Sequence, residues 1–277
     1  MSLVGHGVDI KGSGAVNYRT KKRFGQHFLR DQAVISRIIQ AAAIEADQQV
    51  VEIGPGLGVL TDQLLPISAQ LHVMEIDRDL IALLEQRTEL NLTVHAGDVL
   101  KLDWNKLLPE PPYTLVANLP YNISSQVVFR LLDHRSLFRR MVLMFQREVG
   151  DRLCAEPATK DYGILSVLCQ LWYDIKPVIQ VPPESFNPPP KVDSIVLSFE
   201  PLSAPRVDPG DELFFRKVVK ASFTQRRKTL RNSLQGGGFQ PDVIDPALER
   251  AGIVATRRGE TLSLDEFSRL SHALADA

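Results

Sequence analysis

A glycine-rich loop and two later carboxylates are the first residues of this chain that together could hold a ligand. The loop, Gly54-Pro55-Gly56-Leu57-Gly58, follows a short apolar segment, and glycines in such a turn let the backbone approach a ligand closely. Glu75 lies 21 residues after Gly54, and Asp98 comes later, each at the end of an expected strand. A carboxylate at the position of Glu75 can accept hydrogen bonds from two ribose hydroxyls. The pattern therefore predicts a crevice for a ligand that contains a nucleoside.

The segment Asn118-Leu119-Pro120-Tyr121 has residue types that suit methylation of an adenine amino group. That nitrogen is a poor nucleophile because its lone pair is delocalised into the ring. The Asn118 side-chain oxygen and a neighbouring carbonyl can hold the amino hydrogens and localise the lone pair. Pro120 restrains the backbone and favours an extended Leu119, while Tyr121 offers a ring on which a base can stack. Since Asn does not ionise, it would orient the amino group and leave proton loss to water.

Charge is balanced over the chain but uneven along it. The net charge is −1, yet residues 216–231 carry seven Lys or Arg and no carboxylate, and residues 17–30 carry five and none. A polyanionic partner needs a local basic face and not a basic total. We therefore expect phosphate contacts from these two runs. The expected contact residues are Arg23, Lys217, Lys220, Arg226, Arg227, Lys228 and Arg231.

Metal and disulfide chemistry have no support in the pattern. Cys154 and Cys169 cannot form a disulfide framework and lack metal-ligand spacing, and no histidines sit at helical ligand spacing. We expect no metal. No apolar run reaches the ~20 residues of a membrane span, and the start has no signal-peptide core, so we expect a cytoplasmic protein without membrane contact. No spare apolar face is evident, which favours a monomer.

The elements that must position these residues alternate between strand and helix up to about residue 145. Such alternation predicts a parallel sheet with helices on both faces. Residues 164–181 are expected as one long strand that forms an antiparallel pair with 192–199 at the sheet edge. Asp31 is expected to cap a helix whose apolar residues begin at Val34. The other expected strands are 50–53, 70–76, 92–95, 114–117 and 141–145, and the other expected helices are 59–66, 78–87, 124–133, 211–222, 226–234, 241–251 and 263–275.

Alternating glycines in the loop resemble the S-adenosylmethionine loop of class I methyltransferases, and Asn118-Leu119-Pro120-Tyr121 resembles the motif of amino-directed members. Four further segments narrow the resemblance to the small-subunit ribosomal RNA adenine dimethyltransferase family over about residues 17–277. They are residues 23–29 (RFGQHFL), 121–124 (YNIS), 186–194 (FNPPPKVDS) and 225–232 (QRRKTLRN).

The resemblance implies a fold, a cofactor and roles for single residues. The fold is α/β, a Rossmann-like sheet with a small all-α C-terminal domain. The implied division is a disordered tail at 1–16, a methyltransferase domain at 17–204 and a helical RNA-binding domain at 205–277. Tyr121 and Phe186 would sandwich the target adenine, with Asn118, Leu119 and Pro120 beside it. The cofactor, S-adenosylmethionine, would be held by His27, Leu29, Gly54, Gly56, Glu75, Ile76, Asp98, Val99 and Asn118.

Many family members carry Asn where this chain has His27, which leaves open what the His27 side chain contacts. The family dimethylates N6 of two adjacent adenosines in a hairpin near the 3′ end of the RNA. The implied partner is a precursor of the small ribosomal subunit together with its RNA.

Two other functions remain open from the sequence. A non-catalytic assembly or RNA-binding factor could keep the fold, but intact Glu75, Asp98, Asn118 and Tyr121 argue against it. A DNA adenine methyltransferase shares the reaction motif, and the Phe186 and Gln225–Asn232 segments favour RNA. A nicotinamide dehydrogenase is disfavoured because Val59 stands where the dinucleotide fingerprint needs glycine.

Overall fold

The computed structural model describes Tyr18, Lys21 and residues 26–277, which form two compact units. The first unit extends to Arg147 and includes Lys176–Phe199, and the second consists of Glu148–Ile175 and Glu200–Ala277. The second segment of this unit begins at Glu200, near the expected domain boundary at 204. The unit also includes residues 148–175, which the sequence analysis assigned to the first domain. The expected tail, 1–16, and the expected contact Arg23 lie outside the described residues.

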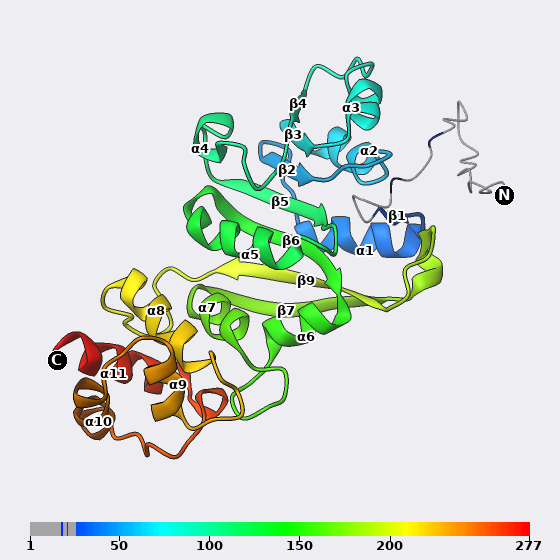
Figure 1. Ribbon diagram of the computed structural model, residues 1–277. Coiled ribbons are helices and arrows are strands. Elements are labelled where there is room, and N and C mark those ends of the chain that lie inside the picture. The colour runs from blue at the N-terminus through cyan, green and yellow to red at the C-terminus, as the bar shows by residue number, and fades with distance from the viewer. Residues whose placement is uncertain (1–17, 19–20, 22–25) are drawn as a thin grey trace. The chain divides into compact units, whose positions relative to one another are not determined.

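A seven-stranded sheet forms the centre of the fold, with strand order β4-β3-β2-β5-β6-β9-β7 (Figure 1). The neighbours from β4 to β6 pair in parallel, and β9 runs antiparallel to β6. The expected mostly parallel α/β sheet with an antiparallel edge is confirmed. The strands are β2 (Gln49–Ile53), β3 (Gln70–Glu75), β4 (Leu92–Ala96), β5 (Tyr113–Asn118), β6 (Phe138–Gln146), β7 (Tyr173–Val181) and β9 (Ser194–Pro201).

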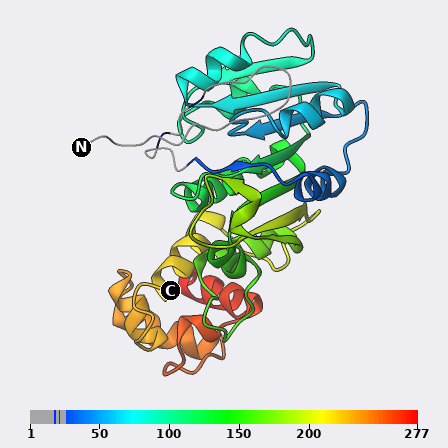
Figure 2. The ribbon, with the colours of Figure 1, turned by 90° about the vertical axis from the view of Figure 1, so that its right-hand side faces the viewer.

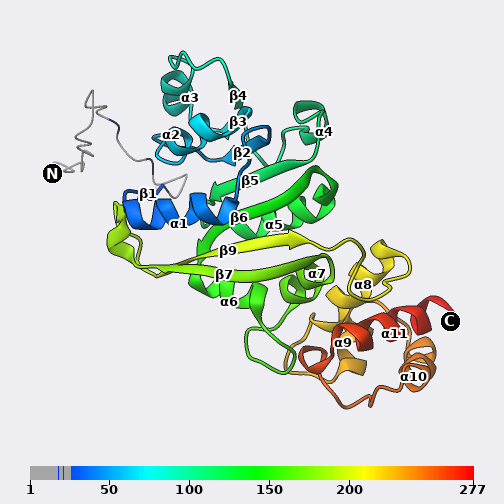
Figure 3. The same cartoon turned by 180° about the vertical axis from the view of Figure 1, so that it is seen from behind.

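Helices cover both faces of this sheet. Figure 1 shows α5 in front of the sheet, and Figure 3, from behind, shows α1 in front of it. Asp31 caps α1 as expected, because its side chain accepts hydrogen bonds from the Ala33 and Val34 nitrogens at 3.0 and 3.3 Å. The remaining short helices of the unit follow the strands. In full, the helices of the unit are α1 (Gln32–Ala42), α2 (Thr61–Leu64), α3 (Arg78–Leu84), α4 (Trp104–Leu107) and α5 (Ser124–Asp133), with 3-10 turns η2 (Leu65–Ile67), η3 (Arg135–Leu137) and η4 (Pro183–Ser185).

A second, two-stranded sheet brings together segments that are far apart in the sequence. β1 (Phe28–Leu29) pairs antiparallel with β8 (Phe186–Asn187), so that Phe28 lies opposite Asn187 and Leu29 opposite Phe186. Strands of two residues carry no hydrophobic period, so the sequence analysis did not detect this pairing. The pairing places His27 beside the 186–188 segment.

The expected single strand over 164–181 is wrong. Residues Ile164–Trp172 form helix α7, and only Tyr173–Val181 form the strand β7. The nearly continuous apolar run fits a buried helix and a buried strand equally well, so periodicity alone misassigned it. The helix begins after Gly163, whose backbone nitrogen donates to the Ser166 hydroxyl at 3.0 Å.

The second unit is otherwise helical, and Figure 2 shows its yellow-to-red helices gathered in one cluster. α9 begins at Leu230 and not at residue 226, because Thr229 is its N-cap and residues 223–228 form turns. The basic residues 226–228, which were expected in the helix 226–234, therefore lie on a turn. The helices are α6 (Arg147–Cys154), which starts at the unit boundary, α7 (Ile164–Trp172), α8 (Glu212–Ser222), α9 (Leu230–Gly236), α10 (Pro241–Arg250) and α11 (Leu264–Ala275), with a 3-10 turn η5 (Gly259–Thr261).

Candidate functional site

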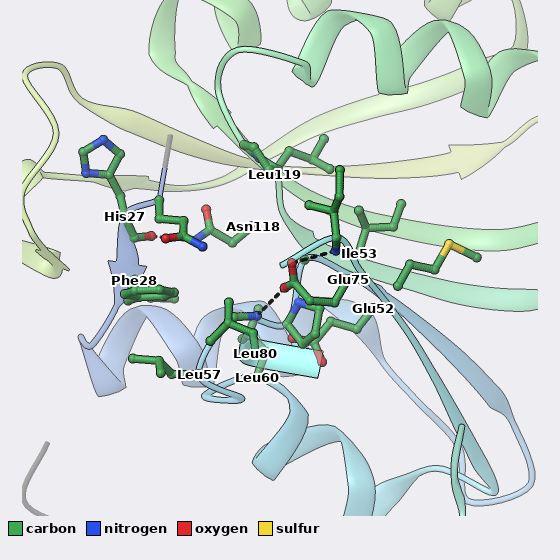
Figure 4. A pocket seen from close by; sticks show the side chains of 18 of the residues that line it. His27, Phe28, Glu52, Ile53, Leu57, Leu60, Glu75, Leu80, Asn118 and Leu119 are labelled. Carbon is green, nitrogen blue, oxygen red and sulfur yellow. Dashed lines mark hydrogen bonds between the residues drawn. The ribbon is translucent and has the colours of Figure 1, made fainter. Parts of the chain in front are cut away.

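A cavity of about 610 Å³ lies in the first unit, at the carboxyl ends of four neighbouring parallel strands (Figure 4). Its walls come from the loops after β2, β3, β4 and β5, together with the segment from Gln26 to Gln32. Ligands of open α/β sheets bind at this edge, because the loops that follow parallel strands converge there. With Asn187, which also lines the cavity, the structure brings together residues that are 161 positions apart in the sequence, from Gln26 to Asn187.

The glycine loop after β2 has the geometry that the sequence predicts. Gly54 and Gly56 have φ angles of 68° and 59°, in the left-handed region that favours glycine. A Cβ atom at Gly56 would also lie 2.9 Å from the ring of Phe28. The loop therefore packs directly under the N-terminal segment, with no room for a side chain between them.

Glu75 shapes this loop and also faces the cavity. Its Oε1 accepts hydrogen bonds from the Ile76 and Asp77 nitrogens at 2.8 and 2.9 Å, and its Oε2 accepts from the Gly56 nitrogen at 3.3 Å. Figure 4 shows the side chain among the cavity walls. Burial raises the pKa of Glu75, against the opposing effect of these backbone donors. Polar hydrogens of a ligand are the partners that would compensate this burial.

Glu52 is a second buried acid of the cavity, and the sequence analysis assigned it no role. Its side chain is 1% exposed and accepts a hydrogen bond from the Thr61 hydroxyl at 2.6 Å. Burial raises the pKa of Glu52 to about 8. An acidic residue inside an otherwise apolar strand was the available signal, because such residues are seldom buried without a partner.

The other expected ligand contacts also line the cavity. Asp98 follows β4 and remains partly exposed, with its Oδ1 accepting from the Leu100 nitrogen at 3.0 Å. Ile76, which follows Glu75, and Val99, which follows Asp98, also line the cavity. Leu29 lines it from the segment Gln26–Gln32. Every residue expected to hold the cofactor is therefore at the cavity.

Asn118 and Tyr121 are held by contacts at both ends of their motif. The Asn118 Nδ2 donates to the His27 carbonyl at 3.2 Å, and Figure 4 shows Asn118 beside the backbone of His27, whose imidazole is directed away. The Tyr121 hydroxyl lies 2.6 Å from the Ser194 Oγ. Leu119 is buried, and Pro120 lines the cavity with its neighbours.

Phe186 is not brought to the cavity. Its ring is 1% exposed and belongs to the hydrophobic core that also contains Leu29 and Val196. Asn187, the next residue, lines the cavity instead. The alternation of side chains along β8 explains the difference, because successive residues of a strand face opposite sides. The expected sandwich of Tyr121 and Phe186 is therefore absent from this arrangement.

Two of the arginines that were expected to contact phosphate are paired with groups of their own unit. Arg226 donates to the Lys160 and Tyr162 carbonyls and lies 3.4 Å from Glu260. Arg231 makes two hydrogen bonds to Asp245, at 2.6 and 2.8 Å. Both therefore stabilise their own unit.

Besides Arg226, four lysines and arginines of the same set are exposed. The Lys217 Nζ lies over the rings of Phe214 and Phe239, at 5.9 and 4.9 Å from their centroids. Lys220 lies on the exposed side of α8, and Arg227 and Lys228 lie on the turn before α9. These four positions remain the candidates for phosphate contact.

Comparison with known proteins places the chain among RNA-modifying enzymes. A family model described as "Ribosomal RNA adenine dimethylase" matches residues 17–275. A protein of Syntrophotalea carbinolica called ribosomal RNA small subunit methyltransferase A is 61% identical over 259 residues, covering 94% of this chain and 98% of its own. The protein of the same name from Geobacter sulfurreducens is 52% identical over 275 residues, covering 97% and 99%.

Two solved structures of methyl-transferring enzymes are also similar to this chain. The crystal structure of a dimethyladenosine transferase from Plasmodium falciparum matches with a TM-score of 0.75 at 29% identity, covering 88% of this chain and 96% of that one. The 23S rRNA methyltransferase ErmE matches with a TM-score of 0.66 at 26% identity, covering 90% and 99%.

Two absences hold for the described residues only. Among Tyr18, Lys21 and residues 26–277, no three His, Cys, Asp or Glu side chains gather as metal ligands. Within the same part of the chain, no helix has the length and hydropathy of a membrane span.

The raised pKa of Glu52 leads us to expect that the free energy of unfolding depends on pH. The folded chain keeps the Glu52 proton up to about pH 8, whereas the unfolded chain loses it near 4.5. The stabilisation is therefore full below pH 4.5 and is lost as the pH rises toward 8. Glu52→Gln has no proton to lose, so its free energy of unfolding should increasingly exceed that of the wild type between pH 5 and pH 8.

Urea unfolding of both proteins across this range measures the effect. Glu85→Gln, an exposed change next to α3, is the control and should follow the wild type. If the free energy of unfolding of Glu52→Gln had the same pH profile as that of the wild type, the assignment of a retained proton to Glu52 would be wrong.

Proposed function

The chain belongs to the ribosomal RNA adenine dimethylase family, and from that membership we propose how its own residues carry out the reaction. The protein is a methyltransferase that uses S-adenosylmethionine to dimethylate N6 of adenine in ribosomal RNA. The observation that carries the residue assignments is the fixed Asn118 amide at the cavity.

The cavity fits S-adenosylmethionine by the chemistry of its walls. It presents two buried acids with raised pKa values, Glu52 and Glu75, and a glycine loop that packs directly against Phe28 at Gly56. Buried acceptors of this kind suit a ligand that carries several hydroxyl and amino donors. Glu75 would accept from the ribose hydroxyls and Asp98 from the adenine amino group. When bound, S-adenosylmethionine supplies an activated methyl group on a sulfonium centre.

Asn118 orients the target amino group. Because its Nδ2 is engaged by the His27 carbonyl, its Oδ1 is the atom left to accept from the adenine N6. Holding the amino hydrogens out of the ring plane localises the lone pair on nitrogen and aligns it for in-line attack. Positioning of this kind can account for most of the rate. Proton loss goes to water, since Asn118 has no ionisable group.

Tyr121 supplies the surface on which the target base stacks. Its ring lines the cavity and its hydroxyl is fixed by Ser194. Stacking of a base on an aromatic ring is worth about 1–3 kcal/mol. Since the ring does not enclose the amino group, a base that already carries one methyl can occupy the same place for the second transfer.

The substrate is ribosomal RNA, and the finer identity of the target is part of the proposal. The curated relatives are named for the small subunit, which supports two adjacent adenosines in a hairpin of a small-subunit precursor. We expect a monomer that acts in the cytoplasm, where such precursors assemble in bacteria like those of the relatives. The exposed Lys217, Lys220, Arg227 and Lys228 would hold phosphates of this RNA.

Removal of the Asn118 amide tests the reaction. Wild-type protein should transfer labelled methyl groups to N6 of adenine on unmethylated small subunits, and Asn118→Ala should be at least about 100-fold slower, because misplacement of a reacting group costs that much. Mass spectrometry of digested ribosomal RNA measures dimethyladenosine. A folded wild-type protein that binds the subunit without methylating it would instead be a non-catalytic assembly factor.

Glu75 tests the cofactor assignment. Glu75→Gln loses one charged acceptor for two hydroxyls, which should weaken S-adenosylmethionine binding by about 1.5–3 kcal/mol, roughly tenfold or more. Calorimetry on the purified protein measures this affinity, with Glu85→Gln as the matched exposed control. An unchanged affinity in folded Glu75→Gln would remove this residue from the cofactor site.

The turn before α9 tests the RNA contact. Arg227→Gln with Lys228→Gln should weaken subunit binding and lower the log–log salt slope by about 0.7–0.9 for each lost phosphate contact, while cofactor affinity stays unchanged. Arg231→Gln is the matched control, because Arg231 is already paired with Asp245 and its loss should affect stability more than the salt slope. Equal salt slopes in the wild type and the double variant would show that the turn is a solvated surface.

A further inference from the structure

The side chain of His27 lies against Tyr121 and not against the glycine loop. The two rings stack with their centroids 5.6 Å apart and an interplanar angle of 24°. Tyr121 is thus restrained twice, at its hydroxyl by Ser194 and on one face by the imidazole. Offset stacking at this separation is within the range that stabilises aromatic pairs.

The imidazole is itself anchored. Its Nδ1 lies 2.8 Å from the Pro188 carbonyl oxygen, and since a carbonyl only accepts, the Nδ1 must carry the hydrogen and donate. Pro188 follows β8, whose pairing with β1 sets the distance between this carbonyl and His27. The ring orientation is therefore fixed by the small sheet and is not a free rotamer.

The backbone of the same residue holds the other half of the target site. The His27 carbonyl accepts from the Asn118 Nδ2 at 3.2 Å. One residue therefore contacts both groups that the proposed function assigns to the target base, through its carbonyl to Asn118 and through its ring to Tyr121.

The stacking distance decides where the base can lie. A base between two rings needs two stacking intervals, roughly 7 Å, and the His27 and Tyr121 centroids are only 5.6 Å apart. The target adenine cannot enter between them without moving one ring. It must use the opposite face of Tyr121, with the imidazole behind.

We propose that His27 is a positioning residue of the target-base site, whose anchored imidazole supports one face of Tyr121 while the base stacks on the opposite face, within the cavity that Tyr121 lines. This inference rests on the proposed function and deepens it. It also answers what the His27 side chain contacts, which the sequence left open, because its ring is directed to Tyr121 and Pro188.

Three substitutions at position 27 separate the ring from the hydrogen bond. His27→Ala removes both. His27→Asn keeps an amide that can donate to the Pro188 carbonyl but has no ring to stack. His27→Phe keeps a flat ring and loses the donor. All three leave the backbone carbonyl that accepts from Asn118.

We expect His27→Ala and His27→Asn to raise the KM for unmethylated small subunits about 3- to 10-fold, as loss of one aromatic pair implies. The kcat should change less than about twofold, since supporting a stacked base is a binding contribution. His27→Phe should recover most of the wild-type KM. Calorimetric affinity for S-adenosylmethionine should be the same in all four proteins, and this also reports folding of each variant.

Several results would overturn the inference. A lower KM in His27→Ala would mean that the imidazole occupies the place of the base. A change confined to cofactor affinity would return His27 to the cofactor site. Wild-type KM in both His27→Ala and His27→Asn would leave the ring without a role. A wild-type protein that transfers no methyl group would defeat the proposed function itself, which keeps the two failures distinct.

Discussion

The hydrogen bond from the Asn118 amide to the His27 carbonyl is the contact on which the arrangement of the site depends. It joins the end of β5 to a segment that lies 91 residues earlier and that is itself fixed by the β1–β8 pairing. Without this contact the amide could rotate, and its oxygen would have no fixed direction. With it, a side chain that cannot ionise becomes an oriented acceptor at a cavity, which is what activation of an amino group requires.

Burial of acids is the second feature of the cavity. Glu52 and Glu75 both have raised pKa values because their surroundings exclude water. Such burial lowers the stability of the empty protein as the pH rises, and it leaves oxygen acceptors that the hydroxyl and amino donors of a ligand can satisfy. Glu75 also accepts three backbone hydrogen bonds, two from the residues that follow it and one from Gly56, so the residue that meets the ligand also holds the loop beneath it.

The second unit shows that a basic run contains residues with different roles. Arg226 and Arg231 are engaged by carbonyls and carboxylates of their own unit, whereas Arg227 and Lys228 point from a turn into solvent. The paired residues stabilise the helices that carry the turn. The exposed ones are available to a polyanion, whose binding to them is sensitive to salt because phosphate contacts release counterions.

The parallel sheet, the glycine loop and the acids at the strand ends could be predicted from the sequence, because alternating apolar segments and local turn chemistry are encoded in neighbouring residues. The same holds for the Asp31 cap and for the Asn118–Tyr121 motif. The division of 164–181 into α7 and β7 could not be predicted, since its apolar run fits both structures. Only the tertiary structure decided that Phe186 lies in the core, that Glu52 keeps a buried proton and that His27 stacks on Tyr121. Each of these depends on which distant segments pack together, and the pairing of β1 with β8 leaves no periodic signal in either segment.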